Sequence, residues 1–327
     1  MVSPPSVRAV VVTWNGAHLL PACLDSLLAQ HVPGGMETLV VDNGSTDGTV
    51  ALLAERYPTV TVVEAGRNLG FAGGAARGTE GFDGEFVVLL NNDARFEPGA
   101  VAALVAHARR PGAERVGAVT ATVLLDEDRR PPRVNSTGLE VTRRGTGQDR
   151  DWLVPRGQES RAEQVFGFCG AAALLRVAAL REVGTFDPWL FLYYEDTDLS
   201  WRLRAAGWDV HHEPAAVALH RHAASSDAGS PLFRYQNTRN SLVVVGRHAP
   251  AAVLARSWGR QVLGAVRAAL AAGLRDPLVR ARVRGLRDAA RRLPRTLQER
   301  RRIWAGAAVP RAEVARLLVA PPRGGRA

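Results

Sequence analysis

Short apolar runs alternate with helical patterns along the first 125 residues of the chain. The apolar runs predict strands at 7–14, 36–45, 59–65, 86–90 and 115–125. Apolar residues at helical spacing predict helices at 16–30, 45–58 and about 98–110. This alternation is typical of an α/β domain, and strands buried on both faces have unbroken apolar runs. We therefore predict a Rossmann-like, mostly parallel sheet covered by helices on both faces.

The second half of the chain is less regular. The polar stretch 126–164 predicts an irregular insertion or a hairpin, and 165–184 predicts a strand followed by a helix. A helix at 198–207 and two short strands ending near His220 follow. From residue 250 only helical patterns remain, and we expect them to be broken at Pro277, Pro294 and Pro310. The predicted domains are a catalytic domain at 1–247 and a helical extension at 248–327.

The charge is concentrated in that extension. The chain has no Lys; residues 1–246 hold 23 Arg and 28 acids, a net charge of −5, whereas residues 247–327 hold 19 Arg and 4 acids, a net charge of +15. Such a segment suits an anionic lipid surface, and its charge suits nucleic acid equally. A solvated helical cap and a homo-oligomer interface are the alternatives, and we expect no nucleic-acid partner.

The apolar segments also indicate the compartment. Cys23 and Cys169 both lie in apolar stretches and are predicted to be free thiols of a reducing compartment. The chain shows no run of about 20 apolar residues and no N-terminal apolar run long enough for a signal peptide. We expect a cytoplasmic protein, with contact to the inner face of the membrane through the basic extension left open.

Polar residues follow several of the predicted strands directly. Each one alone is explained by a turn or a helix cap. The carboxyl ends of parallel strands meet at one sheet edge, however, where α/β proteins bind ligands. The residues are Thr13, Trp14, Asn15, Asp42, Asn43, Asn68, Asn91, Asn92 and Asp93. Asp93 as a lone carboxylate, with substrate phosphates and water, matches the way Mg²⁺ is usually bound.

A second cluster of acids lies in "GTFDPWLFLYYEDTDLSWRLRAAGW", residues 184–208. The dipole of the following helix explains Asp198, which also has Arg202 four residues later. Glu195 and Asp196 follow an aromatic and aliphatic run, so one of them is a candidate general base. His220, at the end of a later strand, is expected at the same sheet edge as Asp93.

Several motifs together resemble a known family. "VVVTWNG", "LVVDNGSTDGT", "RNLGFAGG", "LLNNDARFEPGA", "FLYYEDTDLSWRLRAAGW" and "HRHAAS" occur in this order over roughly residues 7–245. This pattern is similar to the inverting family 2 glycosyltransferases of GT-A fold, in their bacterial rhamnosyltransferase-like branch. The resemblance implies a nucleotide-sugar donor, a divalent metal (Mg²⁺ or Mn²⁺) and a hydroxyl acceptor on a saccharide or lipid-linked saccharide.

The resemblance also implies roles for individual residues. Asp196 falls on the catalytic base, with Glu195 beside it, and Asp93 and His220 fall on metal-binding positions. The implied nucleotide-sugar contacts are Thr13, Asn15, Asp42, Asn68, Gly70, Asn91 and Asn92. The chain departs from the family pattern in two places: Asn91 replaces the first acid of Asp-x-Asp, and Ala75 and Ala76 stand where many relatives carry Asn.

The implied function is transfer of rhamnose from dTDP-rhamnose in cell-envelope polysaccharide synthesis. Transfer of galactofuranose or mannose on the same fold is one alternative. A non-catalytic surface-binding protein that uses the basic extension is another. A sugar-nucleotide pyrophosphorylase is disfavoured, because "TWNGAHLL" lacks a glycine-rich basic loop.

Overall fold

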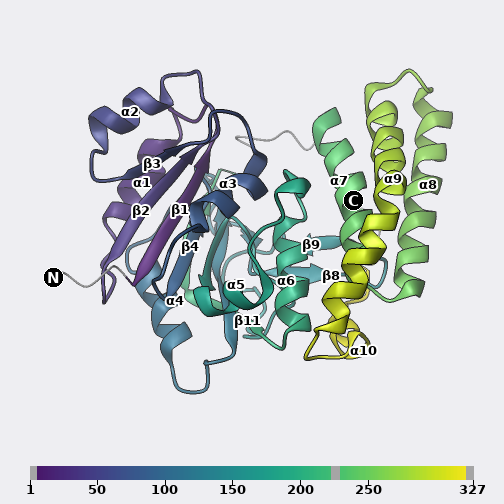
Figure 1. The fold of residues 1–327 in the computed structure, drawn as a ribbon. Coiled ribbons are helices and arrows are strands. Elements are labelled where there is room, and N and C mark those ends of the chain that lie inside the picture. Colours follow the sequence, from purple (N-terminus) through teal and green to yellow (C-terminus); the bar gives the residue numbers. More distant parts are fainter. Residues whose placement is uncertain (1–5, 222–228, 322–327) are drawn as a thin grey trace. The chain divides into compact units, whose positions relative to one another are not determined.

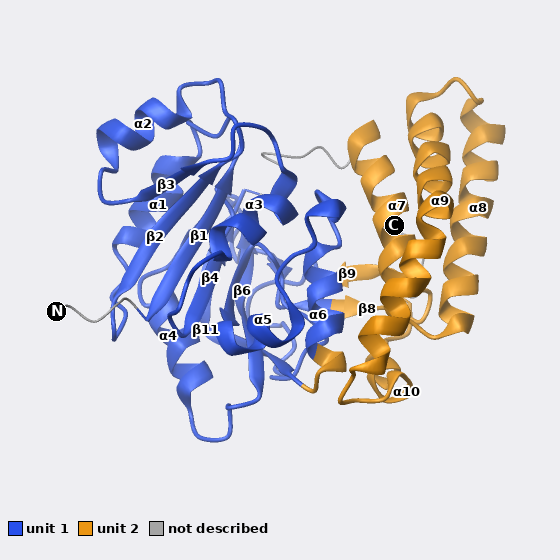
Figure 2. Ribbon diagram, viewed as in Figure 1, with its two compact units in different colours: residues 1–139, 149–203, 208–225 blue, residues 140–148, 204–207, 226–327 orange. Residues whose placement is uncertain are grey.

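The computed structural model describes residues 6–221 and 229–321, and divides into two units (Figure 2). Unit 1 comprises 1–139, 149–203 and 208–225, and unit 2 comprises 140–148, 204–207 and 226–327. The predicted boundary at residues 247 and 248 lies within unit 2. Residues 222–225 of the predicted "HRHAAS" motif lie outside the described residues.

The strands of unit 1 form one mixed sheet in the order β3-β2-β1-β4-β10-β6-β11-β5, with β7 beside β6. Figure 1 labels β1, β2, β3, β4 and β11 of this sheet. The strands are β1 (Val7–Thr13), β2 (Met36–Asp42), β3 (Thr61–Glu64), β4 (Phe86–Leu90), β5 (Ala94–Phe96), β6 (Val116–Leu125), β7 (Val134–Ser136), β10 (Ala172–Arg176) and β11 (Asp209–His220). The helices are α1 (Leu20–Leu28), α2 (Thr49–Arg56), α3 (Gly70–Thr79), α4 (Ala100–Arg109), α5 (Val177–Val183), the 3₁₀ turn η1 (Pro188–Leu190) and α6 (Glu195–Ala205), whose last two residues belong to unit 2. The α/β class and a GT-A-like sheet are as predicted.

Alternation along β1 explains how helices cover both faces of the sheet. Val7, Ala9 and Val11 belong to the core cluster that α1 and α4 complete. The intervening residues face α3, where a Cβ on Gly74 or Gly78 would lie 2.5 or 2.3 Å from a methyl group of Val12 or Val10. These two glycines therefore allow α3 to lie close against β1.

β10 departs from the predicted strand direction. It runs antiparallel to both β4 and β6, while β1, β2, β3 and β4 are parallel to one another. The chain re-enters the sheet at its carboxyl edge, where Asn91 N donates to Ala171 O at 3.0 Å. A strand that enters from this edge must run against its neighbours. The predicted strand-then-helix at 165–184 is confirmed as β10 and α5.

Two predictions about the chain after residue 125 are also settled. The stretch 126–164 contains β7 and a hairpin of β8 (Leu139–Val141) and β9 (Gly147–Asp149), so the predicted insertion does form a hairpin. The prediction of two short strands before His220 is wrong. They form one strand, β11, whose pairing with β6 is irregular between Glu213 and Val217, where Pro214 offers no N–H.

Unit 2 is built mainly from helices. They are α7 (Pro231–His248), which the sequence did not predict, α8 (Ala251–Ala272), α9 (Pro277–Ala305), α10 (Arg311–Val314) and the 3₁₀ turn η2 (Ala315–Leu317). The predicted break at Pro294 is wrong, because α9 continues through it. α9 packs along α7, where Tyr235 Oη donates to Asp288 at 3.0 Å and Arg247 pairs with Glu299 at 2.8 Å. We attribute the continuity of α9 to this packing.

Two further expectations can be compared with the structure. Cys23 and Cys169 are free and buried, as predicted. Within residues 6–221 and 229–321, no helix combines the length and the apolar content needed to cross a membrane.

Candidate active site

The ends of β1 and β4 are joined by a buried hydrogen bond. Asn92 Nδ2 donates to Thr13 Oγ1 at 3.0 Å, and both side chains are buried. Gly16 lies against this pair: a Cβ there would lie 2.4 Å from Thr13 Oγ1 and 2.6 Å from Asn92 Nδ2. The contact fixes two of the predicted site residues, and it requires glycine at position 16.

The end of β2 presents one unpaired carboxylate oxygen. Asp42 Oδ2 accepts from the backbone N–H groups of Gly44 and Ser45, at 3.1 and 3.0 Å. Asp42 is 2% exposed, and no described group donates to its Oδ1. A buried acceptor without a donor is rare and destabilises the free protein by about 1–3 kcal/mol. Asn15, in contrast, uses its Oδ1 to accept from Thr46 N at 2.8 Å and so holds the turn after β2.

The loop before α3 is held by amide side chains. Asn68 Oδ1 accepts from Gly70 N at 2.8 Å, and Asn43 Nδ2 donates to Gly70 O at 3.0 Å. Gly70 has φ of +71°, and a Cβ there would lie 2.1 Å from Phe191 O. Asn68 therefore acts here as a turn residue, and Gly70 is required for both backbone conformation and space.

Asp93 and His220 lie together, as predicted from the strand ends. His220 Nε2 is 3.1 Å from Asp93 Oδ1, and His220 Nδ1 is 2.6 Å from Asn135 Oδ1. When Nδ1 donates to Asn135, the neutral ring has a lone pair at Nε2 that faces the carboxylate. The two acceptors, His220 Nε2 and Asp93 Oδ1, repel each other unless a proton or a cation lies between them. The imidazole and carboxylate donors thus fit a divalent cation such as Mn²⁺.

Glu195, which is buried, and Asp196, which is partly buried, lie side by side at the start of α6. Asp196 Oδ2 accepts from Gly170 N at 3.3 Å, and its Oδ1 accepts from Thr197 N at 2.6 Å and from Thr197 Oγ1 at 3.2 Å. Glu195 Oε2 has no partner among the described residues. Burial raises the pKa of Glu195 well above its ordinary range, and the charge of Asp196 raises it further. Burial also raises the pKa of Asp196, but its hydrogen bonds oppose the rise.

These environments give the two carboxylates different roles. Hydrogen-bond donors favour the charged form of a carboxylate, whereas burial without a donor favours its neutral form. The surroundings therefore oppose charge on Glu195 more strongly than charge on Asp196.

A third acid in this region was not found from the sequence. Burial raises the pKa of Asp149 from 3.8 to about 6; a hydrogen bond with Ser136 opposes the rise, the charge of Asp196 adds to it, and His220 and Cys169 lower the pKa. Asp149 therefore lies within electrostatic range of Asp196 and His220. "GQDRD" contains no pattern that marks it, because Asp149 comes near Asp196 only through the tertiary structure.

The structure thus divides the predicted residues by what their side chains do. Asn15 and Asn68 hold turns, and Thr13 and Asn92 are bonded to each other. Asp42, Asp93, Glu195, Asp196 and His220 carry the charged or titratable chemistry. Asn135, which orients His220, was also missed, since no motif surrounds it.

Comparison with known proteins gives a consistent result. The model for "Glycosyl transferase family 2" matches residues 9–184. The chain is similar to an N-acetylglucosaminyl-diphospho-decaprenol L-rhamnosyltransferase of Mycobacterium tuberculosis, with 30% identity over 254 residues, covering 70% of this chain and 81% of the relative.

Solved structures show the same fold at lower identity. A mannosyltransferase from Pyrobaculum calidifontis, in complex with GDP-Man and Mn²⁺, has a TM-score of 0.54 and 22% identity, covering 89% of this chain and 87% of its own. S. aureus TarS 1–349 with UDP-GlcNAc has a TM-score of 0.54 and 16% identity, covering 93% of each chain.

Proposed function

Because the chain belongs to glycosyltransferase family 2, we propose that it transfers rhamnose from dTDP-rhamnose to a hydroxyl group of a lipid-linked saccharide. The product would serve cell-envelope polysaccharide synthesis, with inversion at the anomeric carbon. The similar rhamnosyltransferase supports this donor and acceptor class. The observation that carries the proposal is the pair of adjacent carboxylates in which Asp196 has three hydrogen-bond donors and the buried Glu195 Oε2 has none.

The reaction is a single displacement in which Asp196 is the general base. The acceptor hydroxyl gives its proton to the Asp196 carboxylate as its oxygen bonds to the anomeric carbon. The bond from that carbon to the diphosphate breaks, and the nucleoside diphosphate leaves with the electron pair. General-base help of this kind typically contributes about 10²–10⁴-fold in rate. Gly170 N and Thr197 fix the orientation of the base.

We propose that the nucleotide-sugar donor binds at the carboxyl ends of β1, β2 and β4. Asp42 Oδ1 is a buried acceptor that a pyrimidine ring N–H would satisfy. Asn91, Asn92 and Thr13 lie at the strand ends where the diphosphate and sugar are expected. Asn15, Asn68 and Gly70 shape the surrounding turns, so we propose that they contribute to donor binding mainly through backbone geometry.

We propose that Asp93 and His220 hold the divalent metal, Mg²⁺ or Mn²⁺. When bound, this ion would neutralise charge that develops on the leaving diphosphate. Asn135 orients the ring of His220 through Nδ1, which is how protein groups commonly orient a metal-binding histidine.

We further propose that unit 2 contacts the membrane that carries a lipid-linked acceptor. Val262, Val266 and Leu270 recur at helical spacing on α8 and are 47%, 49% and 83% exposed. Arg-rich amphipathic helices bind anionic bilayers through apolar burial plus about 1 kcal/mol for each nearby basic side chain. Co-sedimentation with phosphatidylglycerol vesicles, compared with phosphatidylcholine vesicles, tests this, and Leu270→Asp should reduce it. Equal recovery with both lipids would contradict it.

The central test is donor binding and turnover with dTDP-rhamnose, UDP-galactofuranose and GDP-mannose, each with Mg²⁺ or Mn²⁺. Wild type should bind and use dTDP-rhamnose. Asp196→Asn should bind it with similar affinity and lose about 10²–10⁴-fold in kcat. Glu195→Gln is the matched control, because it imitates the neutral form of Glu195; it should retain activity within a few-fold. Equal losses in both variants would refute the assignment of the base.

Two other outcomes separate the alternatives. Use of UDP-galactofuranose or GDP-mannose in place of dTDP-rhamnose would keep the mechanism and change the donor. If no nucleotide-sugar bound but anionic vesicles did, the non-catalytic surface-binding function would replace the enzymatic one.

A further inference from the structure

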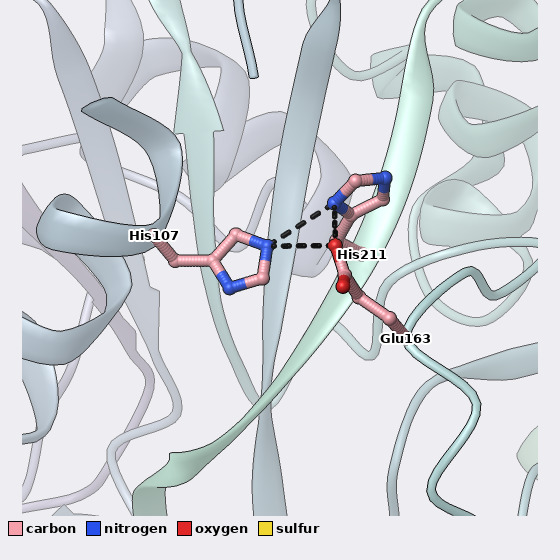
Figure 3. A group of neighbouring side chains, drawn as sticks. All are labelled: His107, Glu163 and His211. Carbon is pink, nitrogen blue, oxygen red and sulfur yellow. Dashed lines mark hydrogen bonds and ion pairs between the residues drawn. The ribbon is translucent and has the colours of Figure 1, made fainter. Parts of the chain in front are cut away.

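A second titratable cluster lies at the other end of β11 from His220. His107 on α4, His211 on β11 and Glu163 in the preceding loop point their side chains toward one another (Figure 3). His211 and His220 pair with Val119 and Leu125 of β6, six positions apart, which corresponds to roughly 20 Å. The cluster therefore does not belong to the candidate active site.

The three potential ligand atoms have the spacing of a metal site. His107 Nε2 lies 3.1 Å from His211 Nδ1 and 3.5 Å from Glu163 Oε1, and His211 Nδ1 lies 2.8 Å from Glu163 Oε1. Tetrahedral zinc with bonds of about 2.0–2.1 Å places its ligand atoms roughly 3.3 Å apart. Shifts of a few tenths of an ångström would bring all three atoms to that spacing.

The surroundings fix the orientation of the ligands. His107 Nδ1 lies 2.8 Å from Glu213 Oε2, so a proton on Nδ1 leaves the Nε2 lone pair facing the cluster. A carboxylate behind a histidine is the usual arrangement around bound metals. Glu163 is held by its backbone, since His212 N donates to Glu163 O at 2.7 Å. The His107 side chain is 3% exposed and that of His211 is 12% exposed, whereas that of Glu163 is 45% exposed, so an ion can enter beside the carboxylate.

One side chain competes with a cation for this position. The Arg110 guanidinium is paired with Glu163 Oε1, and its Nη2 lies 3.4 Å from His211 Nδ1. The Arg110 side chain is 42% exposed, so it is able to turn into solvent. Such an exposed pair contributes only about 0–1 kcal/mol to stability.

We propose that His107, His211 and Glu163 form a three-ligand site for a divalent transition-metal ion of the zinc type, with Glu213 supporting His107 and Arg110 occupying the site in the ion's absence. Two imidazoles and one carboxylate with an open fourth position are a ligand set that zinc binds. The ion would tie α4, β11 and the 155–165 loop together. This role is structural and independent of the proposed transfer reaction.

The test is a Zn²⁺ titration of the metal-free full chain by calorimetry, with Co²⁺ absorption to report tetrahedral coordination. All variants are made in an Asp93→Asn background, so that ions at the candidate active site do not contribute. We expect one Zn²⁺ per chain and no competition by Mg²⁺, which prefers oxygen ligands. Glu163→Gln should weaken Zn²⁺ binding at least tenfold, because loss of even a supporting group weakens metal sites by about 10–100-fold.

Two further variants make the result specific. Arg110→Gln should strengthen Zn²⁺ binding several-fold, since it removes the competing cation. Glu80→Gln is the matched control: Glu80 also pairs with an exposed arginine, Arg77, but lies outside the cluster, so its Zn²⁺ affinity should equal that of the background. Absence of stoichiometric Zn²⁺ binding, or equal affinities for Glu163→Gln and Glu80→Gln, would overturn the proposal.

Discussion

Replacing Asp149 by Asn should stabilise unit 1 at neutral pH and leave its stability unchanged in acid. Asp149 is partly buried near Asp196, and burial raises its pKa from 3.8 to about 6. The folded protein therefore holds this proton at pH values where the unfolded chain has released it. The contribution of Asp149 to the free energy of unfolding is therefore greatest below pH 4, and it declines as the pH rises toward 6.

The size of the effect follows from the two pKa values. Each unit of difference between folded and unfolded pKa corresponds to about 1.4 kcal/mol, so the rise to about 6 corresponds to at most ~3 kcal/mol. Asn has almost the same shape as Asp but has no charge to bury. The free energy of unfolding of Asp149→Asn should therefore exceed that of wild type by up to ~3 kcal/mol at pH 7.5, and the difference should disappear near pH 4.

The assay is urea unfolding followed by tryptophan fluorescence, at intervals from pH 4 to pH 8. Asp83→Asn is the control, because the Asp83 side chain is 94% exposed in a surface pair with Arg181. The difference between Asp149→Asn and wild type should grow across pH 4 to 6, whereas Asp83→Asn should follow wild type closely. A constant difference for Asp149→Asn, or one that shrinks with rising pH, would refute the reasoning.

The remaining predictions concern Gly70, Arg202 and Asp42. Gly70→Ala should abolish stable folding of unit 1 or lower its free energy of unfolding by more than about 3 kcal/mol, because the Cβ would lie 2.1 Å from Phe191 O at a positive φ; thermal unfolding measures this. Arg202→Leu should lower the free energy of unfolding by about 3–5 kcal/mol, because it leaves Asp198, whose side chain is 2% exposed, without a cation 3.0 Å away; urea unfolding measures this. Asp42→Asn should weaken dTDP binding by about 10–100-fold at an unchanged melting temperature, since an amide group would face the ring N–H; calorimetry measures this.

Matched controls separate these effects from general damage. Gly81 also has a positive φ, but a Cβ there would meet no heavy atom within 4 Å, so Gly81→Ala should lower stability by only about 1 kcal/mol. Arg181→Leu removes an exposed ion pair and should change stability by at most about 1 kcal/mol. Stability losses in these controls as large as in Gly70→Ala and Arg202→Leu would contradict the predictions, as would unaltered dTDP binding in Asp42→Asn.

The main strands and the polar residues at the carboxyl edge of the sheet were predictable because local sequence determines them. β4 is a continuous apolar run, and β1 and β2 contain shorter ones at 9–12 and 39–41. Each run is followed by a polar residue at the carboxyl edge of the sheet. Asp93 and His220 could be placed together for this reason, and they lie 3.1 Å apart. The predicted pairing of Asp198 with Arg202 was also local, since the two residues are one helical turn apart.

Features that depend on long-range packing were not predictable. The antiparallel direction of β10 depends on where the 126–164 excursion returns, which no local pattern records. The continuation of α9 through Pro294 depends on its packing along α7, which outweighs the local preference of proline to end a helix.

By itself, therefore, the sequence determined the α/β class, the strand ends and the acidic pair Glu195 and Asp196, because periodicity and turn chemistry act over a few residues. Only the tertiary structure decided the environment of each acid. It gave Asp196 three hydrogen-bond donors and Glu195 Oε2 none, brought Asp149 within electrostatic range of Asp196, and joined His107, Glu163 and His211 from three separate segments. Proton affinity and metal coordination depend on neighbours that are distant in the chain, and these neighbours are defined only once the chain has folded.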